Sequence, residues 1–416
     1  MRMTRALQAG ALGAILGVVV IGLGVVHWIS DRMKVSQKAN LTKGEVATAL
    51  ENSTALGQYP TEIEVSVGGR KKVNTRVEYT FDTRLQSTME KLFESYQPDY
   101  GAFVAMDAVT GRVLSIVSYS RLKRMPENLA LRATFPSASV FKVVTAAAAI
   151  EKYKISANTL IPFNGRNHTL YKTQILQSQI TRWTHFMSLK DAFAKSVNTV
   201  FGKIGAYTVG QESLRHYAGQ FGFNRKIDSD MVIHEGRALI PEDPWGLAES
   251  ASGYTLNNTM SPIQGALIAA AVANEGVMME PYMVQSMANF DDGTLLYLVE
   301  PKVGTVTIDR NTATEIRSLM KETVLNGTSK GSFRGFFKKK LAFLDVGGKT
   351  GSLTGEDPHG KVDWFVGYAD LSPSRIAIAA LTVHEKQWRV KSSYLARRAI
   401  EAYYQDVLSS KTVAKQ

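Results

Sequence analysis

The sequence predicts an α+β fold in which strands from both ends of the main domain form one antiparallel sheet, with helices between them. Strand-like runs occur at residues 101–120 and return at 361–383, while the chain between them carries helical patterns. The composition supports a folded core, because 44% of the 416 residues are hydrophobic and only 21% are charged. This length allows two or three folded units of roughly 100–200 residues each.

Composition also excludes several classes of protein. The chain contains no cysteine, which rules out disulfide scaffolds, thiolate metal sites and cysteine nucleophiles. The net charge of +12 is compatible with a polyanionic partner such as nucleic acid, anionic lipid or an acidic polymer, but it does not distinguish among these. The seven histidines follow no metal-binding pattern, and no aromatic-rich nucleic-acid signature accompanies the basic runs. We therefore expect no metal, no cofactor and no nucleic-acid partner.

A membrane anchor is predicted at the N-terminus. The 25 residues between Arg5 and Asp31 include no Asp, Glu, Lys or Arg. As a helix they would extend about 38 Å, enough to cross a hydrocarbon layer of about 30 Å. Trp28 suits the membrane interface, and the run is too long for a cleaved signal peptide. We expect residues 1–30 to be a short cytoplasmic tail and a single-pass helix in the plasma (inner) membrane. Basic residues on both sides do not decide its direction, but the chemistry below requires the catalytic domain to be extracytoplasmic.

Residues 31–97 are expected to form a stalk or small pedestal. The alternating stretch 62–67 precedes a turn at Gly68–Lys72, which is typical of short strands. An amphipathic helix follows, and its apolar face is expected to carry Leu85, Met89, Leu92 and Phe93.

The main domain is expected over residues 98–408, followed by a tail at 409–416. It begins with a hairpin, in which Gly101–Asp107 and Arg112–Ser120 are joined by turn residues. Two later strands are predicted at Lys361–Tyr368 and Arg375–Val383, and a closing helix offers Tyr394, Ala399, Ala402 and Tyr403 for one face.

Two internal helices are predicted as buried. Ser139–Ile150 is almost entirely apolar after Lys142. Ser261 and Pro262 supply an N-cap and a first-turn proline for a helix at Ile263–Asn274. The second run is too short to span a membrane, so we interpret it as part of the core.

The candidate chemistry begins at Ser139 and Lys142, a Ser-x-x-Lys pattern at a helix start. One turn of helix brings the amine beside the hydroxyl. A serine is a weak nucleophile until a base takes its proton, and burial can lower the pKa of a lysine enough to make it that base. The helix N-terminus also directs free N–H groups toward an oxyanion forming at Ser139.

Two further motifs make this pattern specific. Ser196-Val-Asn198 follows in a helical context, and Lys349-Thr350-Gly351-Ser352 follows a Gly-Gly turn before the last strands. The matches Ser120-x-x-Lys123 and Ser156-x-Asn158 are interpreted as chance occurrences. The order of the three motifs is known from β-lactamases and penicillin-binding proteins.

From about Tyr100 to Tyr404 the chain resembles the transpeptidase domain of penicillin-binding proteins. Beyond the three motifs, the similarity rests on the segments Ser196–Gly205, His216–Phe223, Met260–Gly265, Ala273–Gly276 with Pro281, and Asp363–Tyr368. The resemblance implies a five-stranded antiparallel sheet flanked by helices. It also implies a serine-type D,D-transpeptidase that crosslinks peptidoglycan stem peptides ending in D-Ala-D-Ala and is acylated by β-lactams.

The resemblance further implies a role for each motif residue. Ser139 would attack the penultimate D-alanine carbonyl, and Lys142 would be the general base. Ser196 would relay a proton to the leaving amine. Substrate binding would involve Lys349, Thr350 and Ser352 at the carboxylate and Asn198 at an amide. The oxyanion hole would be formed by backbone N–H groups of Ser139 and Ser352, which flanks Gly351.

Some features depart from the usual family pattern. About 70 residues separate the expected anchor from the hairpin, so we expect no glycosyltransferase domain, and a separate glycan polymerase is the expected partner. The expected pedestal is smaller than is usual in monofunctional members. Ser352 stands where threonine is common, which retains the hydroxyl.

Three alternatives remain open at this stage. A membrane-anchored β-lactamase shares the motifs but needs a water-activating group, and Glu235 and Glu242 lack the family's Glu-x-x-x-Asn setting. A D,D-carboxypeptidase differs only in passing the acyl group to water. A β-lactam sensor or a non-catalytic scaffold is the third, and the intact motifs argue against the scaffold.

Overall fold

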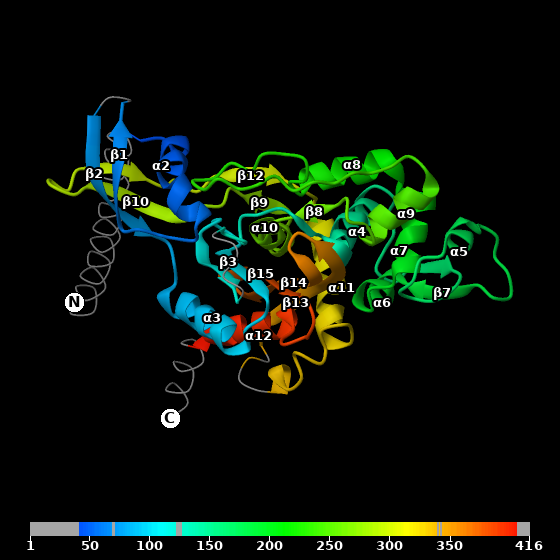
Figure 1. The fold of residues 1–416 in the computed structure, drawn as a ribbon. Helices are drawn as coiled ribbons and strands as arrows, with labels where there is room; N and C mark the ends of the chain where they lie inside the picture. Colours follow the sequence, from blue (N-terminus) through cyan, green and yellow to red (C-terminus); the bar gives the residue numbers. More distant parts are fainter. Residues whose placement is uncertain (1–40, 69–70, 122–126, 339–340, 342, 406–416) are drawn as a thin grey trace, which may run out of the picture. The chain divides into compact units, whose positions relative to one another are not determined.

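The computed structural model describes residues 41–68, 71–121, 127–338, 341 and 343–405 (Figure 1). The predicted anchor at residues 1–30 and the tail at 409–416 lie outside these ranges. None of the helices within them has the length and apolar character needed to span a bilayer. The chain divides into two compact units, each of which is described separately below.

The first unit is built around a four-stranded antiparallel sheet. Its strands follow the order β1 (Glu62–Val67), β2 (Lys71–Tyr79), β10 (Val284–Asn289) and β11 (Leu295–Leu298). The beginning of helix α2 (Lys43–Ala55) also belongs to it. This unit therefore differs from the expected pedestal of residues 31–97, because it also includes Val284–Glu300, a segment from far along the chain.

The second unit contains a five-stranded antiparallel sheet. The strand order is β13-β14-β15-β3-β4, so the start and the end of the domain meet where β15 pairs with β3. The bounds of these strands are β3 (Tyr100–Asp107), β4 (Val113–Ser120), β13 (Asp345–Glu356), β14 (His359–Leu371) and β15 (Ser374–His384). The predicted α+β class, hairpin and late strands are confirmed.

Helices cover both faces of this sheet (Figure 1). On one face, α3 (Thr83–Tyr96) and α12 (Ser392–Tyr403) pack against each other and on the strands through a shared core. Helix α3 buries Leu85, Met89 and Phe93, as its periodicity predicted. On the other face lies α10 (Pro262–Ala273), in which every residue is buried. Helix α12 buries Leu395, Ala396, Ala399 and Ile400, and the predicted Tyr394, Ala402 and Tyr403 are partly buried against the same core.

The remaining elements form the mostly helical part of the second unit. They are β5 (Phe135–Pro136), η1 (Ala138–Phe141), α4 (Lys142–Glu151), β6 (Leu160–Phe163), α5 (Lys172–Leu176), β7 (His185–Ser188), α6 (Leu189–Ala194), α7 (Asn198–Ile204), η2 (Gly205–Val209), α8 (Gly210–Gln220), α9 (Pro244–Ser252), β8 (Thr259–Met260), β9 (Val277–Met279), β12 (Val303–Val306), α11 (Arg310–Leu325) and η3 (Phe336–Lys338).

Trp364 links the sheet to this helical part. Its ring is fully buried in β14, and its Nε1–H donates a 2.9 Å hydrogen bond to the carbonyl oxygen of Pro136, three residues before Ser139. The ring of Phe135 packs edge-on against it. The contact holds the segment that enters the Ser139 turn against β14.

We expect Trp364→Ala to lower the free energy of unfolding by about 3–5 kcal/mol, because it empties a large buried volume and leaves the Pro136 carbonyl without its donor. Urea unfolding of the full chain measures this change. Trp183→Ala is the matched control, since that indole is 69% exposed and should change stability little. Equal effects of the two substitutions would contradict the assignment.

Candidate active site

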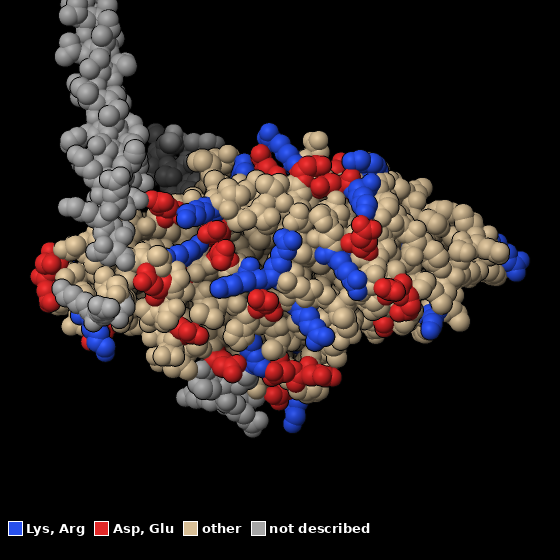
Figure 2. Space-filling view, turned by 90° about the horizontal axis from the view of Figure 1, so that it is seen from above, with Lys and Arg blue, Asp and Glu red and all other residues tan. Residues whose placement is uncertain are grey.

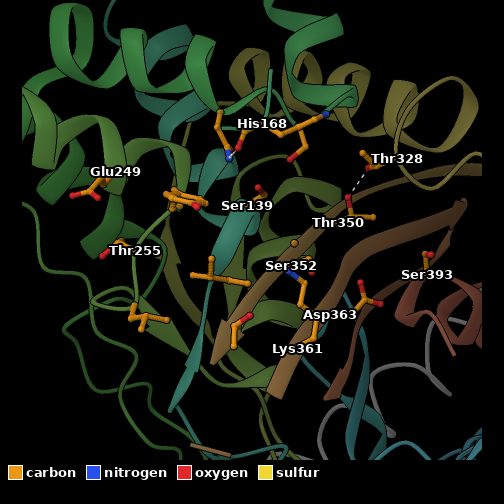
Figure 3. Close-up of a pocket in the computed structure, with 18 of the residues that line it drawn as sticks. Ser139, His168, Glu249, Thr255, Thr328, Thr350, Ser352, Lys361, Asp363 and Ser393 are labelled. Atoms are coloured by element: carbon orange, nitrogen blue, oxygen red, sulfur yellow. Dashed lines mark hydrogen bonds between the residues drawn. The ribbon is translucent and has the colours of Figure 1, made fainter. Parts of the chain in front are cut away.

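The three predicted motifs meet at one cleft in the second unit, with a volume of about 980 Å³ (Figure 3). Six of the predicted site residues line it, namely Ser139, Ser196, Asn198, Thr350, Gly351 and Ser352. The other two, Lys142 and Lys349, are completely buried, and their amines reach the lining serines. The structure therefore brings all eight residues together.

Ser139 is held by a short 3-10 turn instead of the first turn of an α-helix. The turn η1 runs from Ala138 to Phe141 and passes directly into α4 at Lys142. In a 3-10 helix the side chains at i and i+3 lie almost above one another. This geometry places Lys142 Nζ 2.8 Å from Ser139 Oγ.

The amine of Lys142 has three polar neighbours. Besides Ser139 Oγ, it donates to Asn198 Oδ1 at 2.7 Å and to the Ser252 carbonyl oxygen at 2.5 Å. Burial, followed by the nearby positive charge of Lys349, lowers the pKa of Lys142 well below its usual value. The described residues place no carboxylate within salt-bridge distance of this amine. Both causes disfavour the charged form of this amine.

Ser196 and Asn198 lie at a break between two helices. Helix α6 ends at Ala194 and α7 begins at Asn198, and Ser196 between them adopts a left-handed φ of 55°. The Asn198 amide group donates to the carbonyl oxygen of His168 at 2.7 Å, which orients its Oδ1 toward Lys142. The break thus directs two polar side chains into the cleft from one short segment.

Lys349 reaches the cleft from β13, the edge strand of the sheet. Its Nζ donates to Ser196 Oγ and to the Thr350 carbonyl oxygen, both at 2.9 Å, and it lies 5.5 Å from the centre of the Phe193 ring. Burial lowers the pKa of Lys349 to about 7. The Thr350 hydroxyl contacts the Thr328 hydroxyl at 2.5 Å (Figure 3).

Several contributors were missed by the sequence analysis. The carbonyl oxygen of Ser252 positions Lys142, and that of His168 positions Asn198. Both are backbone atoms, so a motif made of side chains could not reveal them. Thr328 and Asp363 also line the cleft. The segment Asp363–Tyr368 had been noted for its similarity, but no position for its carboxylate could be read from the sequence.

Other candidates from the sequence lie elsewhere. Ser120, interpreted as a chance match, ends β4 and does not line the cleft, and Ser156 bonds locally with Thr159. Glu235 and Glu242 are not among the lining residues either, whereas Glu249 is. Its carboxylate points away from Ser139 (Figure 3). Within the described ranges, no cluster of His, Asp or Glu could hold a metal ion.

Residues 101–402 match the family of penicillin binding protein transpeptidase domains. A curated relative is peptidoglycan D,D-transpeptidase PbpA of Mycobacterium tuberculosis, 27% identical over 353 residues, with 75% of this chain and 68% of the relative covered. The fold is similar to the D,D-transpeptidase domain of a peptidoglycan glycosyltransferase from Eggerthella lenta, with a TM-score of 0.65, 22% identity and coverage of 82% and 89%. It is also similar to penicillin-binding protein A from M. tuberculosis as a penicillin G acyl-enzyme complex, with a TM-score of 0.62, 24% identity and coverage of 80% and 81%.

The family match spans most of the chain and includes all three motifs of the cleft. The chain therefore belongs to the penicillin-binding protein transpeptidase domain family. The resemblance expected from the sequence is confirmed.

The buried amines predict an unusual pH dependence of stability. Because the pKa of Lys349 is about 7 in the folded chain and near 10.4 when exposed, the unfolded chain binds one more proton between these values. The free energy of unfolding should therefore rise with pH through this group by about 1.4 kcal/mol per pH unit.

We expect Lys349→Met to reduce the slope of stability against pH by about this amount between pH 7.5 and 9.5, as measured by urea unfolding at several pH values. Titrating groups that do not interact with Lys349 cancel in the comparison with the wild type, whereas the pKa of Lys142 should rise when the charge of Lys349 is removed. Lys302→Met, at an exposed position, should leave the slope unchanged. A Lys349→Met slope equal to that of the wild type would show that the amine is charged when buried.

Proposed function

We propose that this chain is a peptidoglycan D,D-transpeptidase that works through an acyl-enzyme on Ser139 and is inhibited by penicillin. Its family membership and a relative named peptidoglycan D,D-transpeptidase support this function. The observation that carries it is the 2.8 Å approach of the buried Lys142 amine, whose pKa burial lowers, to the hydroxyl of Ser139 in an open cleft.

In the first step, Ser139 Oγ attacks the carbonyl carbon of the penultimate D-alanine, and its proton passes to Lys142 Nζ. A neutral amine has two N–H donors and one lone pair. Asn198 Oδ1 and the Ser252 carbonyl are pure acceptors and take the two N–H groups. The lone pair is then left for the Ser139 proton, so the hydrogen bonds orient the base.

Collapse of the tetrahedral intermediate breaks the C–N bond and releases the terminal D-alanine. The leaving nitrogen takes the proton that Lys142 received from Ser139. Ser196 Oγ, which lines the cleft and accepts a 2.9 Å hydrogen bond from Lys349 Nζ, would relay it. Free N–H groups of Ser139 and Ser352 would stabilise the oxyanion. The Gly351 position lies against this turn, since a Cβ there would be 3.3 Å from Ser139 N.

The substrate carboxylate would bind at the Lys349 end of the cleft. The protonated form of Lys349 attracts it, and the hydroxyls of Thr350 and Ser352 can donate to it. Asn198 would contact a substrate amide. In the second step, the amine of a neighbouring stem peptide attacks the ester carbonyl and loses a proton to Lys142 Nζ. The ester C–O bond then breaks, the crosslinking amide bond remains, and Ser139 Oγ takes the proton back from Lys142. Penicillin would acylate the same serine.

The setting of the enzyme is also part of the proposal. The uncharged run between Arg5 and Asp31 supports a single-pass anchor in the plasma membrane, with the catalytic domain on its outer side. A separate glycan polymerase would supply the strands to be crosslinked. Figure 2 shows basic and acidic side chains interspersed on one face of the molecule. That face therefore does not favour binding of a polyanion.

Fluorescent penicillin tests the nucleophile. We expect covalent labelling of the full-length protein to be abolished by Ser139→Ala, because no other hydroxyl is paired with a buried amine in a Ser-x-x-Lys arrangement within the described residues. Ser120→Ala is the matched control and should label normally. In-gel fluorescence measures both, and labelling that survives Ser139→Ala would overturn the assignment.

Product analysis tests the acceptor. With a lipid-linked pentapeptide substrate, a transpeptidase should form dimeric muropeptides, whereas a carboxypeptidase should form only monomers that lack the last D-alanine. Chromatography with mass spectrometry separates these products. Rapid turnover of nitrocefin would instead indicate a β-lactamase, a result we do not expect because the cleft-lining Glu249 points away from Ser139.

A further inference from the structure

A second pocket lies outside the catalytic cleft, in the part of the second unit formed by residues 160–208. The strands β6 and β7 pair there as a small antiparallel sheet, and α7 packs against β6 and α5 (Figure 1). We call residues 160–208 the lobe, and its cavity of about 230 Å³ the lobe pocket. None of the residues that line the lobe pocket lines the catalytic cleft, so the proposed chemistry does not use it.

The lining of the lobe pocket is rich in amides and hydroxyls. It includes the side chains of Asn164, Gln177, Gln179, Thr184 and Tyr207. Such groups donate and accept hydrogen bonds without carrying a charge, so they suit a ligand with several hydroxyl or amide groups. The cavity is smaller than the roughly 300–1,000 Å³ of pockets for drug-sized ligands, which limits the ligand to about one polar ring.

Asn164 is the residue that most clearly indicates a ligand. It is only 8% exposed, and no described residue forms a hydrogen bond with its Oδ1. A buried carbonyl oxygen without a donor costs free energy, and native structures rarely leave one in that state. Because Asn164 lines the lobe pocket, a hydroxyl of a ligand bound there can donate to this oxygen.

Tyr207 and Lys203 form one wall of the lobe pocket. Lys203 Nζ lies 5.1 Å from the centre of the Tyr207 ring and donates a hydrogen bond to the carbonyl oxygen of Gln177. The amine is thereby fixed beside the ring, and Tyr207 is still 48% exposed. An exposed aromatic ring held in this way can pack against the C–H face of a sugar ring.

The lobe also carries an exposed indole and an excess of positive charge. Trp183, which directly precedes the pocket-lining Thr184, is 69% exposed, and the Arg182 guanidinium lies 4.7 Å from the centre of its ring. Residues 160–208 include six Lys or Arg and a single acidic residue, Asp191. The lobe is therefore suited to a ligand that combines polar rings with negative charge.

The lobe pocket and the catalytic cleft share one helix. Asn198, at the start of α7, lines the cleft, whereas Lys203 and Ile204 of the same helix line the lobe pocket. Five residues of an α-helix span about 7.5 Å. A polymer whose reacting part lies in the cleft can therefore reach the lobe with an adjoining segment.

We propose that the lobe pocket binds a sugar ring of the peptidoglycan strand whose stem peptide occupies the catalytic cleft, an inference that rests on the proposed function. Asn164 Oδ1 accepts from a sugar hydroxyl, and Tyr207 packs against the ring. The lysines and arginines of the lobe attract the carboxylates that the strand carries on its stem peptides. An anionic lipid surface would also attract aromatic and basic side chains, but its acyl chains cannot use the amides of the pocket.

Peptide-free glycan strands test this site apart from the catalytic cleft. Such strands, from which an amidase has removed the stem peptides, keep the sugars and bear a carboxylate on alternate rings. We expect the wild-type full chain to bind end-labelled strands, as measured by fluorescence anisotropy. Tyr207→Ala should weaken this binding at least about tenfold, because it removes the aromatic wall of the pocket.

Phe290→Ala is the matched control for the loss of an aromatic ring. Phe290 is 45% exposed and has the Arg76 guanidinium over its ring, but it belongs to the first unit. This variant should bind the strands as the wild type does. Neither substitution changes the net charge, so non-specific attraction of a polyanion would persist equally in both variants.

Asn164→Leu separates recognition from packing. Leucine has a similar volume but no oxygen, so we expect strand binding to weaken about fivefold or more while the free energy of unfolding, measured with urea, does not fall. An asparagine with a merely structural role would show the opposite result, with lower stability and unchanged binding.

The outcomes distinguish this proposal from the one on which it rests. No binding of the strands, or equal binding by the wild type and Tyr207→Ala, would overturn the lobe site alone. So would binding to vesicles of phosphatidylglycerol and phosphatidylcholine in place of the strands. Failure of fluorescent penicillin to label Ser139 would instead overturn the proposed function, and the assignment of the strand as substrate with it.

Discussion

The chemistry of this protein depends on one buried amine whose neighbours are neutral. Lys142 is fully buried and bonded to an amide oxygen and a carbonyl oxygen. A carboxylate at either place would favour the charged ammonium, which has no lone pair to accept the proton of Ser139. Burial and the nearby Lys349 act in the same direction, because both disfavour a positive charge on Lys142. Burial thus makes the amine a weaker base but favours its unprotonated form, which can accept the proton of Ser139.

The backbone around this amine is held in left-handed conformations that residues other than glycine rarely adopt. Ala138 and Ser196, both non-glycine residues, have φ values of 47° and 55°. Conformations of this kind persist where the surrounding packing determines them, and they are common at functional sites. Gly253 shows how tight that packing is: a Cβ at this glycine would lie 1.8 Å from the Ala138 carbonyl oxygen. The turn that carries the nucleophile is therefore shaped by a residue more than a hundred positions later.

Much of the fold could be predicted because the patterns are local. The apolar periodicity of α3 and the cap and proline before α10 both identified real elements. The motif order identified serines and lysines that the structure brings together at one cleft, and Ser120, interpreted as a chance match, does not line it. The 3-10 turn at Ser139 was missed, since the sequence from Ser139 to Ile150 carries the same apolar pattern in either helix type. The sequence analysis did not predict that β10 and β11 pair with the first two strands, because they come from a distant segment of the chain.

The sequence by itself determined which side chains can react: a serine three residues before a lysine, a Ser-x-Asn and a Lys-Thr-Gly-Ser, with no cysteine or metal pattern to compete. Only the tertiary structure decided their protonation and orientation. The pKa of a lysine depends on how much water reaches it and on which atoms surround it, and those atoms come from segments far apart in the chain.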